Sequence, residues 1–292
     1  MKHIKAMITG LMFASLIHVP AVQAELAWVG CGISKKAYMS EIAKAFEKKE
    51  GIHITIDGGG ATKGIRETAA GVADLGGSCR HLMLEDSEKG VKLHAIAWDA
   101  LVAIVNPDNP VSDISHGDLR KVFSGEITNW KQLGGDDHKI DVFAREGKIS
   151  GVGMMARELI FGNADADFKV TQEFESTGPL EKAVEKSKYS IGLDGVSSAK
   201  KSKVKILNLN GVDPSVQNIS NGTYKLFRPL YIVTAVKMTP DVAKFIDYIK
   251  SPEGQAVIQS QGTVTLKEGS ALWGPYRENM KNVTGQSKGV FE

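Results

Sequence analysis

Residues 52–75 read IHITIDGGGATKGIRETAAGVADL, and this stretch decides the fold class. Its β-branched start, Ile52 to Ile56, predicts a strand, and residues 62–70 predict a helix. A second, short strand is expected at Ala73 to Leu75. The same alternation of strand and helix precedes this stretch, over residues 26–49. Alternation of this kind predicts an α/β protein in which helices cover both faces of a parallel sheet.

Two long apolar stretches, Ala95 to Asn106 and Phe227 to Ala235, divide the chain symmetrically. If both cross between lobes, the first lobe is discontinuous and the second is inserted into it. A ligand cleft is then expected between the lobes, near helix N-termini. The predicted boundaries are a leader over 1–24, lobe I over 25–103 and 229–270, lobe II over 104–228, and a polar, loosely attached tail over 271–292.

The N-terminal segment, Met1 to Ala24, has the pattern of a secretory signal. Lys2 and Lys5 form a basic start, Ile8 to Val19 is mostly apolar, and small residues precede a cleavage site after Ala24. We therefore expect an exported, periplasmic protein. No later segment is apolar enough to predict a membrane span.

The charge balance argues against nucleic acid as a partner. The chain has 36 basic and 34 acidic residues, and two of the lysines belong to the predicted leader. The remainder is formally neutral, whereas nucleic-acid binding usually needs a basic face. No nucleophile motif, catalytic carboxylate pair or metal signature stands out, so we predict a monomeric binding protein that is not an enzyme and has no cofactor.

Three glycine-rich loops lie in the first third of the chain: VGCGIS at 29–34, GGGATKG at 58–64 and LGGSCR at 75–80. Each is expected between a strand and a helix, where backbone N–H groups and the helix dipole favour an anion. The only two cysteines, Cys31 and Cys79, lie in the first and third loops. Because export permits disulfides, a bridge between them is one interpretation and a free thiol pair is the other.

Several motifs resemble those of a known family. They are ADLGGSCR at 73–80, AIAWD at 95–99, IVNPDNP at 104–110, FSGEITNW at 123–130, FRPLY at 227–231 and SPEGQ at 251–255. In this order they resemble the periplasmic phosphate-binding proteins of ABC phosphate importers, in their wider phosphate-binding-like branch. The resemblance covers the chain to about Leu266. It implies a type II periplasmic binding fold, with two hinge strands and closure of the lobes on a tetrahedral oxyanion.

The resemblance also implies a set of ligand-binding residues. Hydroxyl and backbone donors are expected from the helix starts, and planar guanidinium forks from two arginines. The implied residues are Ser34, Lys35, Ala61, Thr62, Ser78, Cys79, Arg80, Arg145, Ser150, Gly151 and Val152.

Two departures from the family pattern bear on the ligand. The loop that begins at Arg145 is one residue longer than usual and has Val152 where threonine is expected, so Lys148 is a candidate source of replacement charge. Cys79 stands where relatives have aspartate or serine, and the carboxylate that would accept a proton from hydrogen phosphate is missing there. Replacement acceptors are sought among three carboxylates, Asp57, Asp99 and Glu146.

The leading interpretation is an exported solute-binding protein that captures phosphate or arsenate by lobe closure. Its membrane partner is an ABC permease or a sensor histidine kinase, and an arsenate-sensing relative of the importer protein is one version of this interpretation. The alternative is a thiol-based protein that binds arsenite or a soft metal through Cys31 and Cys79, since thiolates favour soft ions.

Overall fold

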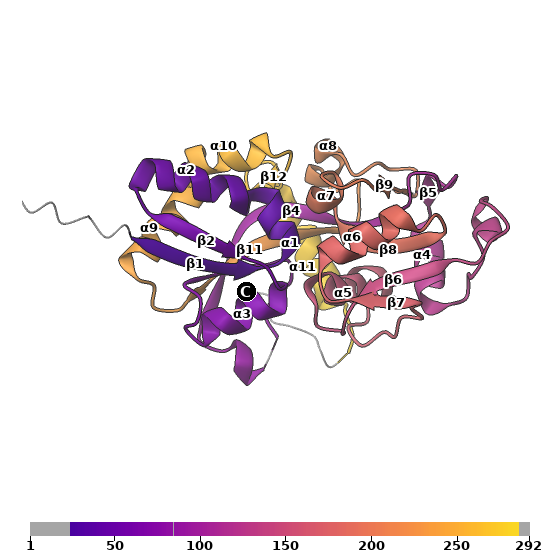
Figure 1. Cartoon of the computed structure of the whole chain (residues 1–292), viewed down its shortest axis with the longest axis horizontal. Coiled ribbons are helices and arrows are strands. Elements are labelled where there is room, and N and C mark those ends of the chain that lie inside the picture. The colour runs from indigo at the N-terminus through magenta and orange to yellow at the C-terminus, as the bar shows by residue number, and fades with distance from the viewer. Residues whose placement is uncertain (1–23, 84, 286–292) are drawn as a thin grey trace, which may run out of the picture.

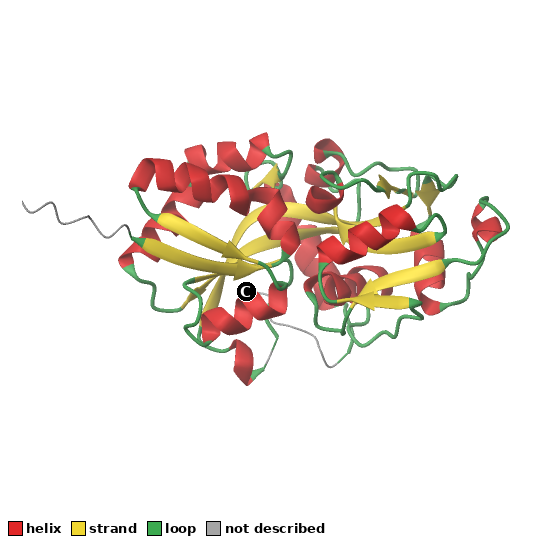
Figure 2. Cartoon of the chain, in the orientation of Figure 1, coloured by secondary structure: helices red, strands yellow, loops and turns green. Residues whose placement is uncertain are grey.

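Two α/β lobes lie side by side along the long axis of the molecule (Figure 1). The computed structural model describes residues 24–83 and 85–285, so the predicted signal sequence, apart from Ala24, lies outside the described residues. Helices lie on both sides of the strands in each lobe (Figure 2). The predicted two-lobe α/β architecture is therefore confirmed. No helix in the described part of the chain combines the length and hydrophobicity needed to cross a bilayer.

Lobe I is built on five strands in the order β2-β1-β3-β11-β4. Strand β1 is parallel to both β2 and β3, whereas β11 is antiparallel to β3 and to β4. The strands are β1 (Glu25–Gly30), β2 (His53–Asp57), β3 (Leu75–Ser78), β4 (Val91–Val105) and β11 (Phe227–Ala235), with the short β12 (Val264–Thr265) beside β4. The helices are α1 (Gly32–Ser34), the π-helical turn η1 (Lys35–Met39), α2 (Ser40–Glu50), α3 (Ala61–Ala69), the 3-10 turn η2 (Asp86–Glu88), α9 (Pro240–Lys250) and α10 (Pro252–Ser260).

Lobe II continues the hydrogen-bonded order with β4-β8-β6-β7. Its strands are β6 (Asp141–Arg145), β7 (Gln172–Phe174) and β8 (Ser190–Gly195), with β9 (Lys205–Ile206) on β4 and a separate pair, β5 (Asp113–Ile114) and β10 (Asn208–Leu209). Its helices and turns are α4 (His116–Ser124), η3 (Trp130–Leu133), α5 (Gly151–Ala156), η4 (Arg157–Phe161), α6 (Thr177–Lys186), α7 (Val196–Ala199) and α8 (Val216–Ser220). The chain ends with η5 (Ser270–Leu272) and α11 (Trp273–Lys281).

The 15-residue strand β4 joins the two lobes. It pairs with β11 as far as Ala100 and with β8 from Leu101 onward. The first predicted crossing stretch therefore does pass between lobes. Strand β11 instead pairs along its whole length with β3 and β4 of lobe I, so the chain has already returned when β11 begins. The exact residue boundaries predicted for the two lobes stay a prediction.

Two glycines that the sequence suggested as loop, Gly76 and Gly77, belong to β3. The expected strand at Ala73 to Leu75 is therefore displaced toward the C-terminus. The indole of Trp28 lies over this strand, and a Cβ atom on Gly77 would stand only 2.1 Å from that ring. Glycine is required here because the ring and the backbone approach so closely.

The expectation of a loosely attached C-terminal tail was wrong for its first part. Residues 273–281 form α11, in which Tyr276 and Met280 are buried. The ring of Trp273 lies 4.6 Å, centroid to centroid, from that of Trp98, a fully buried residue of β4. Aromatic and apolar residues spaced along α11 supply an apolar face that the polar composition of the tail concealed.

Docking of α11 predicts the effect of shortening Met280. We expect Met280→Ala to lower the free energy of unfolding by about 2–5 kcal/mol, since a buried methionine leaves a cavity. Urea denaturation followed by far-ultraviolet circular dichroism measures this change. Asn279→Ala, at the exposed neighbouring position, is the matched control and should change stability little. Equal, small effects of the two substitutions would contradict the docking of α11.

Candidate functional site

A cavity of about 190 Å³ lies where loops of the two lobes meet. Lobe I contributes the start of α3 to its wall, and lobe II contributes the loop after β6 and one residue before α6. The lining residues are Gly59, Gly60, Ala61, Thr62, Arg145, Glu146, Ile149, Ser150 and Glu175. A larger hollow of about 550 Å³ is lined by residues 122–171 of lobe II only. The smaller cavity is the better candidate site, because both lobes build it and helix α3 begins at it.

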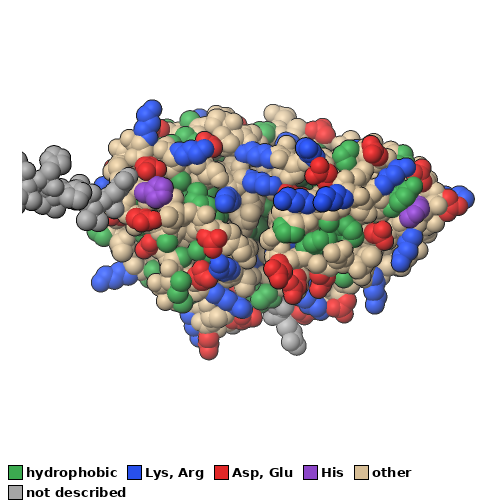
Figure 3. Space-filling view, in the orientation of Figure 1, with side chains coloured by type: hydrophobic (Ala, Val, Ile, Leu, Met, Phe, Trp, Pro, Cys, Tyr) green, Lys and Arg blue, Asp and Glu red, His purple; other side chains and the backbone are tan. Residues whose placement is uncertain are grey.

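Direct contacts hold the lobes together around this cavity. Lys36 of η1 forms an ion pair with Glu181 of α6, with the Nζ and Oε2 atoms 2.6 Å apart. The Thr62 hydroxyl of α3 donates to the carbonyl oxygen of Ile149 at 2.8 Å. Lysine and arginine side chains stand along the groove between the lobes (Figure 3). The structure thus shows the two lobes in direct contact, with cationic groups along the groove between them.

The lobe I wall is the N-terminus of α3. Its N-cap residue, Gly60, has a φ of 96° and no side chain with which to cap the helix. Ala61 is buried and Thr62 is partly buried at the first two helical positions. The first amide groups of α3 therefore lack a side-chain cap where the cavity lies, and this is a favourable environment for negative charge.

The lobe II wall is dominated by Arg145 at the end of β6. Its Nε donates to the Phe174 carbonyl at 3.1 Å, its Nη1 donates to the Thr177 hydroxyl at 3.3 Å, and its Nη2 donates to the Glu175 carbonyl. A Cβ atom on Gly60 would lie 3.6 Å from Nη2, so the guanidinium reaches the opposite lobe. Burial lowers the pKa of Arg145, and the nearby cysteines oppose this effect. The sequence did not point to Thr177 as its support.

The two cysteines meet beside this wall. Both are buried and unbridged, and their thiols are hydrogen-bonded to each other. Cys31 Sγ also accepts a hydrogen bond from the Ser34 amide at 3.3 Å and lies 3.1 Å from the Ser34 hydroxyl. Burial alone would raise the pKa of Cys31, but hydrogen bonds from Cys79 and Ser34 outweigh it and lower the pKa to about 7. The hydrogen bond to Cys31, together with burial, raises the pKa of Cys79. The disulfide stays a prediction.

Gly151 brings lobe II against the thiol pair. A Cβ atom on Gly151 would lie 2.4 Å from Cys79 Sγ and 3.0 Å from Cβ of Ala61. Any larger residue would therefore force the two lobes apart. Neighbouring Ser150 caps α5 by accepting from the Gly153 amide at 3.2 Å, and Val152 is buried without a polar group.

One buried arginine, Arg228 of β11, was not among the predicted site residues. Its side chain is fully buried, and its two polar contacts are long: Nη2 to Asp99 Oδ2 and Nη1 to the Gly151 carbonyl, each at 3.4 Å. Its Nε has no acceptor within the described residues. Burial alone would lower the pKa of Arg228, but the charges of Cys79, Asp99 and Cys31 raise it. The available signal was an arginine inside the otherwise apolar motif FRPLY, because a buried charge needs a partner.

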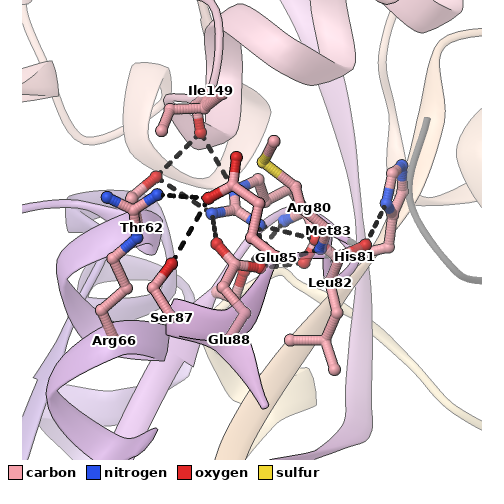
Figure 4. A network of polar contacts seen from close by, with 11 residues as sticks. Thr62, Arg66, Arg80, His81, Leu82, Met83, Glu85, Ser87, Glu88 and Ile149 are labelled. Carbon is pink, nitrogen blue, oxygen red and sulfur yellow. Dashed lines mark hydrogen bonds and ion pairs between the residues drawn. The ribbon is translucent and has the colours of Figure 1, made fainter. Parts of the chain in front are cut away.

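Arg80 does not offer the free guanidinium that the resemblance implied. Its side chain is buried, and both terminal nitrogens contact the carboxylate of Glu88 in η2 (Figure 4). Its remaining donors go to the Ile149 and His81 carbonyls and to the Thr62 hydroxyl. The neighbouring Ser78 hydroxyl is also used locally, because it donates to the Arg80 carbonyl at 2.7 Å and accepts from the Arg80 amide.

The two lysines among the candidate residues, Lys148 and Lys35, do not reach the cavity. Lys148 donates to the Asp165 carbonyl and pairs with Asp167 at 2.6 Å, so it does not replace the missing threonine donor in this structure. Lys35 is partly buried in η1 and is not among the lining residues of the cavity. The predicted ligand-binding residues therefore fall into three groups. Some line the cavity, some belong to the thiol cluster, and some are already paired with other groups of the protein.

The three candidate proton acceptors lie in different surroundings. Asp99 is buried and accepts from the Ser197 amide and hydroxyl at 3.0 and 2.7 Å. Asp57 is exposed and pairs with Lys63 at 3.0 Å. Only Glu146 of the three lines the cavity.

Comparisons with known proteins show which family this chain resembles. A model of the PBP superfamily domain matches residues 29–253. The phosphate-binding protein PstS of Borreliella burgdorferi is 33% identical over 223 residues, which cover 73% of this chain and 80% of that protein. PstS of Bacillus subtilis is 28% identical, with coverage of 82% and 80%. A putative phosphate ABC transporter substrate-binding protein with bound phosphate from Clostridium perfringens has a TM-score of 0.77 and 29% identity, covering 82% of this chain and 99% of its own.

The buried pair of Arg80 and Glu88 predicts a structural role for both residues. We expect Glu88→Ala to lower the free energy of unfolding by about 3–5 kcal/mol, because it leaves a buried charge without its partner. The double variant Arg80→Met, Glu88→Leu should recover most of this loss, as urea denaturation will measure. Asp86→Ala, which breaks an exposed ion pair with Lys89 in the same turn, is the control and should have little effect. A Glu88→Ala protein of unchanged stability would contradict this role.

The thiol cluster predicts how Cys31 titrates. In the reduced protein we expect the ultraviolet absorbance of one thiolate to rise with a midpoint near pH 7, because hydrogen bonds stabilise the charged form. Cys31→Ser should remove this transition, whereas Cys79→Ala should move it to higher pH by removing one of the hydrogen bonds. Iodoacetamide labelling of the denatured protein provides the total thiol count. If both thiols titrated together near the ordinary cysteine pKa, the interaction between Cys31 and Cys79 would be contradicted.

Proposed function

Because this chain belongs to the PBP superfamily, and within it to the family of periplasmic phosphate-binding proteins of ABC importers, we propose that it captures a tetrahedral oxyanion, phosphate or arsenate, between its lobes. Members of this family bind solutes and are not enzymes. The relatives named above are phosphate-binding proteins, and the proposal carries this property to the present chain. Export to the periplasm is part of the proposal.

The observation that carries the proposal is the position of Arg145. It lies on the wall of an interlobe cavity with its Nη2 directed at the start of α3, where helix amides lack a side-chain cap. A guanidinium opposite a helix N-terminus suits an anion with several oxygen atoms. Closure of the lobes then replaces the hydration shell of the anion with N–H groups of the helix start and with the guanidinium of Arg145.

The charge around the cavity favours an anion that still carries a proton. Glu146 and Glu175 line the cavity together with Arg145. A carboxylate accepts a hydrogen bond from the O–H of a protonated oxyanion but repels an anion that has only acceptor oxygens. We infer that hydrogen phosphate and hydrogen arsenate bind more tightly than sulfate, with Glu146 in the role that aspartate has in the importer relatives.

The protein is proposed to pass its bound anion, or the closed conformation that the anion stabilises, to a membrane partner. An ABC permease takes up the anion itself, whereas a sensor histidine kinase responds to the closed form. Both partners recognise the closed arrangement of the lobes, which here includes the ion pair of Lys36 with Glu181 across the groove.

Anion titration tests the proposal. Isothermal titration of the purified chain with phosphate, arsenate, sulfate and molybdate should give one site, with phosphate or arsenate bound more tightly than sulfate. Arg145→Gln should weaken binding by about 10- to 100-fold, because it removes a charged donor. Glu146→Gln should reduce the preference over sulfate.

Arg120→Gln is the matched control, since Arg120 is exposed and does not line the interlobe cavity. It should leave the affinity for every anion unchanged. No heat of binding with any of the four anions, from a chain that circular dichroism shows to be folded, would remove the proposed function.

A further inference from the structure

The two thiols form a compact sulfur pair that the proposed anion contacts do not use. Cys31 comes from the loop between β1 and α1, and Cys79 from the end of β3, so lobe I alone supplies both. Their exposed fractions are 3% and 1%. The Cys31 amide donates to the Gly77 carbonyl at 3.1 Å, which places its loop beside the end of β3, and the two thiols interact there. The Ser34 amide and hydroxyl hold Cys31 Sγ in place at 3.3 and 3.1 Å. The pair is therefore oriented before any ligand arrives.

A buried positive charge accompanies the sulfur pair. The guanidinium of Arg228 interacts electrostatically with both cysteines, and Asp99 at 3.4 Å is its one carboxylate partner. Its Nε has no acceptor among the described residues, so the guanidinium is incompletely satisfied. A buried arginine of this kind favours additional negative charge beside it. A pair of thiolates would supply that charge.

We propose that Cys31 and Cys79 form a two-thiolate binding site for a soft monovalent metal ion of the copper(I) type. Binding converts two S–H bonds into two sulfur–metal bonds and releases two protons to solvent, without any change in oxidation state. The product has a net charge of −1, from two thiolates and one monovalent cation. Arg228, which also pairs with Asp99, lies close enough to both sulfurs to interact favourably with this charge.

The donor set selects this class of ion over others. The chain has two cysteines in all, and the described residues contain no group of three or more histidine, cysteine, aspartate or glutamate side chains that could hold a metal. Zinc needs four ligands in a structural site and three in a catalytic site. Thiolate ligands select soft ions such as copper(I).

The geometry couples this site to lobe closure. Gly151 of lobe II packs so closely on Cys79 that a Cβ atom there would lie 2.4 Å from Sγ. The lobes therefore seal the sulfur pair in the closed arrangement, and an ion enters or leaves when they separate. The proposed metal site uses the two Sγ atoms, whereas the proposed anion site uses Arg145 and the first amides of α3. Both sites lie between the lobes.

Titration with copper(I) tests the site. The reduced chain, without its leader, is titrated anaerobically with copper(I) in competition with a chromophoric copper(I) chelator. We expect one ion per chain, and loss of that binding in both Cys31→Ser and Cys79→Ser. Arg228→Gln should retain the stoichiometry but weaken binding about tenfold, as outer contacts to metal ligands typically do. Ser260→Ala, at an exposed position near the end of α10 that leaves both sulfurs and Ser34 in place, is the control and should still bind one ion.

Three outcomes would overturn the proposal. These are absence of copper(I) binding by a folded chain with two titratable thiols, copper(I) binding that survives in the double cysteine variant, and binding of arsenite without binding of copper(I). Phosphate titration of Cys31→Ser separates this site from the proposed anion site. Retained phosphate binding with lost copper(I) binding supports a distinct sulfur site, whereas joint loss of both ligands would count against it.

Discussion

Strand β4 supplies the backbone hydrogen bonds of both lobes, and the rest of the molecule is arranged around it. Nine of its first ten residues pair with β11, with a register shift at Ile96, and its last five pair with β8. Because each buried backbone N–H and C=O group needs a partner, a strand shared between two sheets fixes how the lobes are connected. The loops that follow β1, β2, β3 and β6 then meet between the lobes. The cavity, the thiol pair and the buried arginines all lie where those loops converge.

Burial decides which charged groups remain for a ligand. Arg80 and Glu88 are both fully buried and satisfy each other, so this arginine maintains the loop that contains Cys79. Arg145 is held by carbonyl and hydroxyl acceptors, none of which carries charge, and therefore remains electrostatically available. Arg228 has only one distant carboxylate partner. Positive charge thus remains available at the interlobe cavity, from Arg145, and beside the thiols, from Arg228. Arg80, which lies in the most recognisable motif, is neutralised by Glu88.

Small residues determine how closely the lobes approach. Gly60 exposes the start of α3, and Gly151 allows lobe II to touch Cys79. Gly60 is required by its φ of 96°, which residues with a Cβ atom rarely adopt, whereas at Gly151 a Cβ atom would lie only 2.4 Å from Cys79 Sγ. The distance between the lobes therefore depends on the side chain at position 79, because Gly151 packs directly on Cys79 Sγ. A chemical change at the sulfur pair is consequently expected to affect anion capture between the lobes.

The alternation of β-branched and helical segments determined the α/β fold, because local periodicity and turn glycines act over a few residues. The glycine-rich loops likewise predicted an anion site between the lobes, which stays a prediction, and the ordered motifs identified the family. Tertiary structure alone decided the roles of the arginines, since Arg228 lies 129 positions from Asp99 and its surroundings come from distant loops. It also decided that residues 273–281 pack as a helix on Trp98, and that Cys31 and Cys79 meet. Pairing of buried charges and packing of rings depend on contacts between remote segments, which no local pattern specifies.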